Sequence, residues 1–227
     1  MIRNLLLFFL ILPQIISAQT NPEEKLGKWW MYFGTHQINE KFSVHYETQL
    51  RNYEILNNFF QLLPRAGINY HIADNSIITA GYAWIPTQPI MGEGWNNELV
   101  IENRIWEQFI LRNKVNNIKF RHRYRLEQRW VKSAGVSAYK NRARYMLSVR
   151  IPLKSDPEFP LFISLYDEIF LNISEEPFDQ NRLFGALGIQ VNDNMNIQVG
   201  YLRHRLGTQN LNRLQFAVFL NTGKKED

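Results

Sequence analysis

Between residues 118 and 130 the chain alternates almost without exception between polar and apolar side chains. The odd positions of this segment are Lys119, Arg121, Arg123, Arg125, Glu127 and Arg129, and the even positions are mostly aromatic or aliphatic. A period of two indicates an extended strand, because successive side chains point to opposite faces of a sheet. A soluble protein turns such charges to water, whereas a membrane barrel turns its apolar face to lipid and its charges to the lumen.

The N-terminus has the layout of a secretory signal peptide. Arg3 precedes an apolar run over residues 5–16, and Ser17-Ala18-Gln19 supplies small residues at a cleavage site. The run is short for a membrane-spanning helix, which needs about 20 apolar residues. We therefore expect a signal peptide over residues 1–18, cleaved after Ala18, and export of the mature chain.

The sequence contains no cysteine. An exported chain without disulfides depends on core packing or on a closed, hydrogen-bonded sheet for its stability. Cysteine-based metal sites and thiol catalysis are excluded as well. No linker, low-complexity tract or composition break interrupts residues 19–227, so we expect this stretch to form a single β-barrel domain.

Almost every segment of the mature chain alternates in the same way, and none keeps a helical period. The expected strands cover residues 29–37, 41–53, 59–72, 77–85, 98–113, 118–131, 140–153, 160–173, 181–192, 195–206 and 211–222. Such strands exceed the usual length of about 5–6 residues and suit the tilted crossing of a bilayer, which takes about 9–11 residues. Short connections rich in Asn and Asp alternate with longer ones at 86–97, 132–139 and 174–180, as in outer-membrane barrels.

These features predict an all-β fold, an antiparallel up-and-down transmembrane β-barrel that follows an N-terminal signal peptide. Single-chain bacterial barrels usually have an even number of strands, so we expect roughly 10–12 strands with 12 favoured, and we treat the odd number of segments above as a miscount. A soluble lipocalin-like barrel is the alternative fold, and it requires the apolar side chains inside and the arginines outside.

Several phrases of the sequence, taken in order, resemble one protein family. They are Gly81-Tyr82-x-Trp84, Glu102-Asn103-Arg104-Ile105-Trp106-Glu107-Gln108, Arg121-x-Arg123-x-Arg125-Leu126-Glu127-Gln128-Arg129, Arg142-x-Arg144-Tyr145, Asp167-Glu168-x-Phe170-x-Asn172, Phe178-Asp179-Gln180-Asn181-Arg182 and Gly200-Tyr201-Leu202. Their order and spacing resemble the DUF2490 family of uncharacterised bacterial proteins, which is grouped with outer-membrane β-barrels. The resemblance implies a barrel in the bacterial outer membrane and supplies no catalytic residue. The composition and the cleavage site resemble those of Bacteroidota proteins.

If the apolar faces of the strands meet lipid, the polar faces converge in the lumen. An Arg at the bilayer midplane costs about 2–4 kcal/mol, so a row of arginines does not face lipid. The expected lumen charge network consists of Glu102, Arg104, Arg121, Arg123, Arg125, Glu127, Arg129, Arg142, Arg144, Arg150, Glu168 and Arg182. Fixed positive charge attracts anions, and the planar guanidinium group binds carboxylate or phosphate through paired hydrogen bonds.

Three functions are open at this point. The leading one, by analogy alone, is a porin-like barrel that passes or binds small anionic solutes such as acidic saccharides. The second is a non-conducting structural barrel in which the lumen carboxylates pair with arginines. The third is an outer-membrane lipid hydrolase, for which Ser43 and His45 share a strand face and His71 could neighbour them. Because no Gly-x-Ser-x-Gly phrase is present, we expect no catalytic residue and no enzyme.

Other ligands are not expected. The sequence has no His-x-x-His spacing and no glycine-rich phosphate loop, so we expect neither a metal site nor a cofactor. The formal net charge of +5 raises the question of nucleic acid. The arginines and the aromatic residues lie on opposite faces of the same strands, which prevents a base from stacking beside a phosphate contact. The expected partners are outer-membrane lipid and small anionic solutes, with no nucleic acid.

Overall fold

The computed structural model describes residues 25–55, 58–91, 94–95, 98–153, 160–174 and 176–223. Its strands are β1 (Gly27–Gln37), β2 (Phe42–Asn52), β3 (Phe59–Ala73), β4 (Ser76–Thr87), β5 (Ile90–Met91), β6 (Gly94–Trp95), β7 (Val100–Val115), β8 (Ile118–Ser133), β9 (Val136–Pro152), β10 (Leu161–Asn172), β11 (Phe178–Asn192), β12 (Met195–Leu206) and β13 (Gln209–Thr222). No helix in these residues is long and apolar enough to cross a membrane. The expected signal peptide of residues 1–18 and its cleavage site after Ala18 lie outside the described residues.

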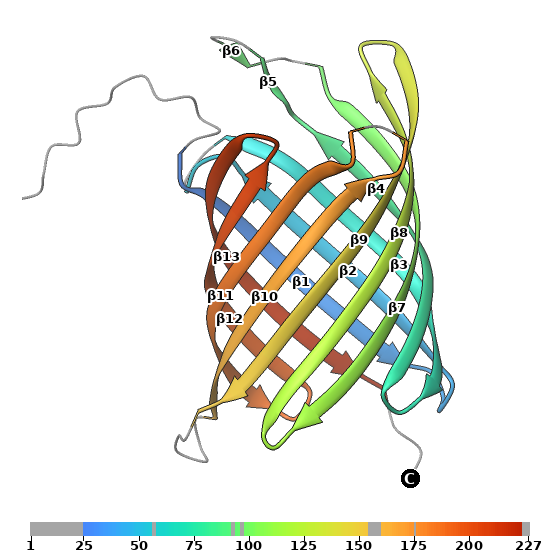
Figure 1. Cartoon of the computed structure of the whole chain (residues 1–227), viewed down its shortest axis with the longest axis vertical. Coiled ribbons are helices and arrows are strands. Elements are labelled where there is room, and N and C mark those ends of the chain that lie inside the picture. Colours follow the sequence, from blue (N-terminus) through green and yellow to red (C-terminus); the bar gives the residue numbers. More distant parts are fainter. Residues whose placement is uncertain are drawn as a thin grey trace, which may run out of the picture.

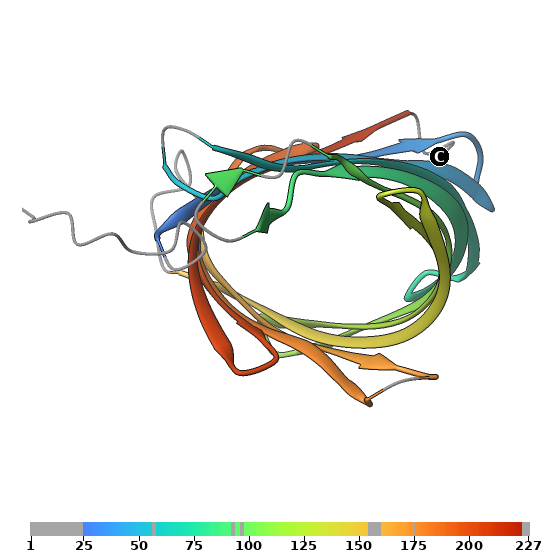
Figure 2. The ribbon, with the colours of Figure 1, turned by 90° about the horizontal axis from the view of Figure 1, so that it is seen from above.

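All strands except β5 and β6 close into one barrel, in the order β1-β13-β12-β11-β10-β9-β8-β7-β4-β3-β2 (Figure 1). Figure 2 looks along the barrel and shows the strands closing into an oval ring. The short strands β5 and β6 pair only with each other. The prediction of an all-β barrel is therefore confirmed.

Side chains alternate between the inside and the outside of the barrel as the sequence pattern predicts. On β8, Arg123 and Arg125 point inward and are 9% and 3% exposed, whereas Tyr124 and Leu126 point outward and are both 49% exposed. Aromatic and aliphatic side chains cover the outer face in the same way on the other strands. This orientation is the reverse of the lipocalin-like alternative, which is therefore wrong.

The barrel has eleven strands, so the favoured count of twelve is wrong. β1 and β13 close the ring by pairing in parallel, from Gly27 opposite Arg213 to His36 opposite Thr222, while every other neighbouring pair in the barrel is antiparallel. An even count is required only when the first and last strands run in opposite directions. Parallel strands also form a regular hydrogen-bonded ladder, which permits an odd number.

The connections between barrel strands fall on two ends of the barrel (Figure 1). One end, called the loop end here, carries residues 53–55, 58, 88–91, 94–95, 98–99, 134–135, 173–174, 176–177 and 207–208 of these connections. The other, called the turn end, carries residues 38–41, 74–75, 116–117, 153, 160 and 193–194. Because the number of strands is odd, β1 begins at the loop end and β13 finishes at the turn end.

The connection expected at 132–139 is mostly strand. β8 continues to Ser133 and β9 begins at Val136, so only Ala134 and Gly135 form the turn. Their φ angles are 47° and 78°, in the left-handed region that a two-residue type I′ hairpin requires at both positions. Asn-Gly suits such a turn better than Ala-Gly, because the left-handed conformation costs Asn less free energy than it costs Ala.

Replacing Ala134 by Asn is therefore expected to stabilise the barrel by up to about 1 kcal/mol. Urea-induced unfolding in detergent, followed by tryptophan fluorescence, would show a higher midpoint with an unchanged slope. Ala138→Asn, four residues further along β9, is the matched control and is expected to give no gain, because Asn is unfavourable within a strand. Equal gains in the two variants would contradict the assignment of strain to Ala134.

Candidate functional site

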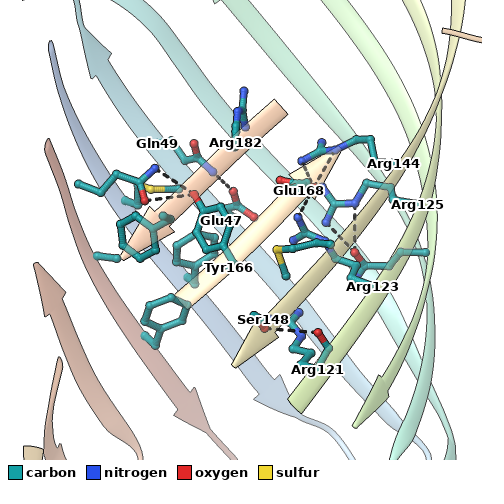
Figure 3. A pocket seen from close by; sticks show the side chains of 18 of the residues that line it. Glu47, Gln49, Arg121, Arg123, Arg125, Arg144, Ser148, Tyr166, Glu168 and Arg182 are labelled. Atoms are coloured by element: carbon teal, nitrogen blue, oxygen red, sulfur yellow. Dashed lines mark hydrogen bonds and ion pairs between the residues drawn. The ribbon is translucent and has the colours of Figure 1, made fainter. Parts of the chain in front are cut away.

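The barrel encloses a cavity of about 900 Å³ that is lined by inward-facing side chains (Figure 3). All members of the expected lumen charge network except Glu127 line this cavity. Glu127 is 1% exposed and lies behind the arginines that bind it. The structure thus places the charged residues singled out from the sequence on the inside of the barrel.

Glu127 on β8 accepts hydrogen bonds from three arginines. Arg142 lies directly opposite on β9 with Nη2 at 2.6 Å, while Arg104 on β7 and Arg144 on β9 lie diagonally with Nη1 at 3.2 Å and 2.5 Å. All three arginines are at most 7% exposed. A buried carboxylate requires such charged, hydrogen-bonded partners, because neither water nor salt compensates its charge there.

Glu168 on β10 extends this cluster toward the turn end. It accepts hydrogen bonds from Arg123 Nη2 at 2.6 Å and from Arg144 Nη2 at 2.7 Å. Arg144 therefore bridges Glu127 and Glu168. Figure 3 shows Arg123, Arg144 and Glu168 meeting on one wall of the cavity.

Two more carboxylates extend the cluster toward the loop end. Glu102 binds Arg104 at 2.6 Å and Arg129 at 2.8 Å, and Asp179 binds Arg142 at 2.6 Å. We call the resulting set the ion-pair network: Glu102, Arg104, Arg123, Glu127, Arg129, Arg142, Arg144, Glu168 and Asp179. It holds five adjacent strands, β7 to β11, together through side chains as well as through backbone hydrogen bonds.

A row of neutral hydrogen bonds crosses the lumen wall beside the network. Asn69 Nδ2 donates to Ser43 Oγ at 2.9 Å, Thr79 Oγ1 donates to Asn69 Oδ1 at 2.7 Å, and Gln108 Nε2 donates to Thr79 Oγ1 at 3.2 Å. Arg125 ends the row, because its Nη2 donates to Gln108 Oε1 at 2.6 Å. The row satisfies the polar atoms of four strands and leaves the charge of Arg125 without a counter-charge.

Arg125 is one of four lumen arginines whose hydrogen-bond acceptors are glutamines. The pairs are Arg51 with Gln49 and Gln61, Arg125 with Gln108, Arg150 with Gln190, and Arg182 with Gln180. Among the described residues, no carboxylate oxygen lies within 4.0 Å of these four guanidinium groups. A glutamine oxygen satisfies a hydrogen bond but carries no charge, so each of these arginines keeps its full positive charge.

The sequence-based network and the observed network overlap without being the same. Arg121, Arg125, Arg150 and Arg182 face the lumen but form no ion pair within the described part of the chain. Conversely, the expected network lacks Asp179, because β11 begins at Phe178 and the predicted strand began at 181.

A second ion pair was also missing from the expected network. Glu47 and Arg65 are 2% and 7% exposed and lie opposite each other on β2 and β3, with a distance of 2.5 Å between Glu47 Oε2 and Arg65 Nη2. Both residues occupy polar positions in the alternating pattern of segments 41–53 and 59–72, so the sequence already indicated that they face the lumen. Arg51 on β2 and Arg213 on β13 follow the same rule and are 6% and 2% exposed.

The residues of the hydrolase alternative do not assemble as expected. Ser43 Oγ lies 2.9 Å from His71 Nε2, whereas His45 lies opposite Gly67 and its Nε2 is 3.4 Å from Glu47 Oε2. Ser43 is 0% exposed. A nucleophile has to meet the substrate as well as its base, and this degree of burial keeps the Ser43 hydroxyl away from any molecule in the lumen.

Two tryptophans pack inside the barrel. Trp106 on β7 is 0% exposed and lies over Gly81 on β4 and Gly67 on β3, where an added Cβ would stand 2.5 Å and 3.0 Å from its ring. Trp29 on β1 is 1% exposed, and the guanidinium group of Arg51 lies 4.0 Å from the centre of its ring. Glycine is required at 67 and 81 because an added side chain would meet both the indole ring and the backbone oxygens of Ala80 and Ala66.

The search of curated proteins and the search of solved structures gave no match to this chain. The comparison with protein families gave a match over residues 26–215 to the family described as "Protein of unknown function (DUF2490)". The matched residues include β1 to β12 and the start of β13, and therefore every member of the ion-pair network. The chain belongs to the DUF2490 family.

Proposed function

We propose that the protein is an outer-membrane barrel whose lumen takes up small anionic solutes. The observation that supports this most directly is the set of lumen arginines paired with glutamine. Charges of this kind are costly in a confined, low-dielectric space unless a counter-ion is present. An anion that enters the lumen supplies that counter-charge.

The balance of buried charge supports the same proposal. Among the described residues, the buried charged side chains are arginines 51, 65, 104, 123, 125, 142, 144 and 213 and glutamates 47, 102, 127 and 168. Arginines thus outnumber glutamates two to one. A passage lined by one sign of charge concentrates ions of the other sign.

The outer face supports a membrane location. Large apolar side chains such as Tyr82, Leu126 and Leu183 are 51%, 49% and 54% exposed, and they recur on neighbouring strands around the barrel. An apolar belt of this extent is unfavourable in water and suits lipid. The expected signal peptide supports export to the outer membrane.

A second candidate is a barrel that binds anions without conducting them. It is favoured by the ion-pair network, which occupies lumen space between Glu102 near the loop end and Glu168 near the middle of β10. In this case the network would act as a closure, and solutes would reach the lumen from the turn end only.

Planar-bilayer recording distinguishes passage from binding. In a KCl gradient, the purified barrel is expected to show a reversal potential shifted toward the equilibrium potential of chloride, because the fixed lumen charge is positive. Replacing Arg125 by Gln removes one uncompensated charge and is expected to reduce this selectivity. A cation-selective pore would contradict the proposal. The absence of a pore would exclude passage of anions and leave binding as the function.

Cysteine modification tests anion attraction whether or not the barrel conducts. The chain has no cysteine, so Ser148→Cys places a single thiol in the lumen beside Arg121. The anionic reagent sulfonatoethyl methanethiosulfonate is expected to react roughly tenfold or more faster there than its cationic trimethylammonium analogue, after correction for their rates with a free thiol. Thr208→Cys in the exposed loop-end turn is the control. If the two reagents have equal corrected rates at position 148, as they are expected to have at position 208, uptake of anions is contradicted.

A further inference from the structure

The turn-end half of the lumen carries more cations than carboxylates. From Glu127 toward the turn end, the inward-facing residues of β8 are Arg125, Arg123, Arg121 and Lys119. The inward-facing carboxylates closest to the turn end are Glu47 on β2 and Glu168 on β10. Beyond them, no described inward position of a barrel strand is acidic, and Asp74 in the turn after β3 is the acidic residue that lines this end of the cavity.

Cations lie directly opposite one another on three adjacent strands. Arg112 on β7 faces Arg121 on β8, Lys114 faces Lys119, and Lys119 in turn faces Arg150 on β9. We call these five residues the basic wall, and all of them line the cavity. Like charges in directly opposite positions destabilise a sheet, so the basic wall is unfavourable unless an anion lies against it.

Buried donors point to the same place. Arg121 Nε and Arg123 Nε are both buried and have no hydrogen-bond partner in the described part of the chain. Buried polar atoms are nearly always hydrogen-bonded, and an unpaired donor on a charged group is especially costly. An anionic oxygen between the basic wall and Arg123 would remove both the repulsion and the unpaired donors once the side chains adjust to it.

The opposite side of the same half is apolar. Met31 and Phe33 on β1 and Ala217 and Phe219 on β13 line the cavity, and we call them the apolar wall. The rings of Phe33 and Phe219 are stacked, with centroids 4.6 Å apart and planes at 6°. β1 and β13 lie across the ring from β8 in the strand order (Figure 2). A ligand in this space therefore meets guanidinium and ammonium groups on one side and aromatic carbon on the other.

We infer that the turn-end half of the lumen binds an organic anion with an apolar body, its phosphate or carboxylate on the basic wall and its body against Phe33 and Phe219. The inference rests on the proposed uptake of anions and names the class of solute. Small aryl and alkyl acids have this chemistry, and so do anionic lipids. A purely hydrophilic anion would use the basic wall alone.

Calorimetric titration of the full mature barrel in a non-ionic detergent tests the inference. Phenyl phosphate is expected to bind at least about tenfold more tightly than inorganic phosphate, because burying the ring adds a favourable apolar contribution. Dodecyl phosphate identifies the source: displacement of phenyl phosphate by dodecyl phosphate assigns the site to lipid-like anions, and lack of displacement assigns it to compact acids.

Two pairs of variants separate the walls. Phe219→Ala is expected to remove the preference for phenyl phosphate while the affinity for inorganic phosphate stays the same. Phe216→Ala is its control, since Phe216 lies on the outer face of the same strand and stacks on Trp30. Arg121→Gln is expected to weaken the binding of both ligands. Arg203 is an exposed, outward-facing residue of β12, and Arg203→Gln is expected to leave the binding of both ligands unchanged.

The outcomes distinguish this inference from the proposed function. Equal affinities for the two phosphates, or equal effects of Phe219→Ala and Phe216→Ala, would overturn the inference and leave anion uptake standing. Failure of both phosphates to bind overturns the inference too. If the thiol at position 148 then also shows no preference for the anionic reagent, anion uptake itself fails.

Discussion

Replacing Glu127 by Gln is expected to destabilise the barrel by about 3–5 kcal/mol or to prevent its folding. Arg104, Arg142 and Arg144 direct hydrogen bonds to this carboxylate and are at most 7% exposed. A glutamine accepts some of these bonds and supplies no negative charge, so three buried guanidinium groups lose their shared counter-charge. Urea-induced unfolding in detergent and the heat-modifiable mobility of the folded barrel on SDS gels would measure the loss.

Two controls make this result specific to buried charge. Glu127→Asp keeps the negative charge and is expected to retain part of the stability. Glu107→Gln removes a carboxylate on the outer face, which accepts one hydrogen bond from Gln128 Nε2 at 3.2 Å, and is expected to cause no loss. An unchanged unfolding midpoint for Glu127→Gln, or an equal loss for Glu107→Gln, would contradict the role assigned to the ion-pair network.

Replacing Trp106 by Ala is expected to lower stability by about 3–5 kcal/mol. The indole ring is 0% exposed, packs on Gly67 and Gly81, and lies 4.8 Å from the guanidinium group of Arg125. Its removal leaves a void in the lumen and removes the cation–π contact of Arg125. Unfolding in urea would show the lower midpoint, and a conducting barrel would show a larger single-channel conductance.

Trp84→Ala is the matched control for this prediction. Trp84 lies on the outer face of β4 and is 43% exposed, so its truncation leaves no void inside the barrel. Gly81→Ala is expected to destabilise the barrel as well, because the added methyl group would stand 2.5 Å from Cζ2 of Trp106 and would also clash with the backbone oxygen of Ala66. If Trp84→Ala costs as much stability as Trp106→Ala, the ring at 106 does not pack inside the barrel in the way described.

Alternation in the sequence was sufficient to predict the strands and the faces of the barrel. Segments such as 118–131 and 211–222 lie within β8 and β13, and their charged side chains face inward, whereas the amides of Gln128 and Asn212 face outward. The reason is physical: a strand between lipid-like and polar surroundings has to separate its side chains every second residue. The same signal identified Arg104, Arg125 and Arg144 as lumen residues.

The pairing of those residues could not be predicted. Whether Glu127 meets Arg142 or Arg150 depends on the register between β8 and β9, and one sequence contains no information on register beyond turn length. For this reason Arg125 and Arg182 were expected in a charge network, although glutamines are their acceptors. His71, and not His45, approaches Ser43 for the same reason.

The predicted number of strands is wrong because the prediction assumes that the first and last strands pair in antiparallel fashion. The alternating segments of the sequence correspond to the eleven barrel strands. The rule that bacterial barrels have an even number of strands leads away from this count. The rule describes barrels whose ends meet in antiparallel fashion. Side-chain periodicity is identical in parallel and antiparallel strands, so nothing in residues 27–37 or 209–222 distinguished the two.

The parallel seam between β1 and β13 has a consequence for biogenesis. The two strands that complete the cylinder lie near opposite ends of the described chain, so the seam between them forms only when β13 is in place. Until this seam forms, β1 and β13 each expose a strand edge with unpaired amide and carbonyl groups, which favours aggregation. A barrel of this topology is therefore completed by pairing two strands that are far apart in the sequence.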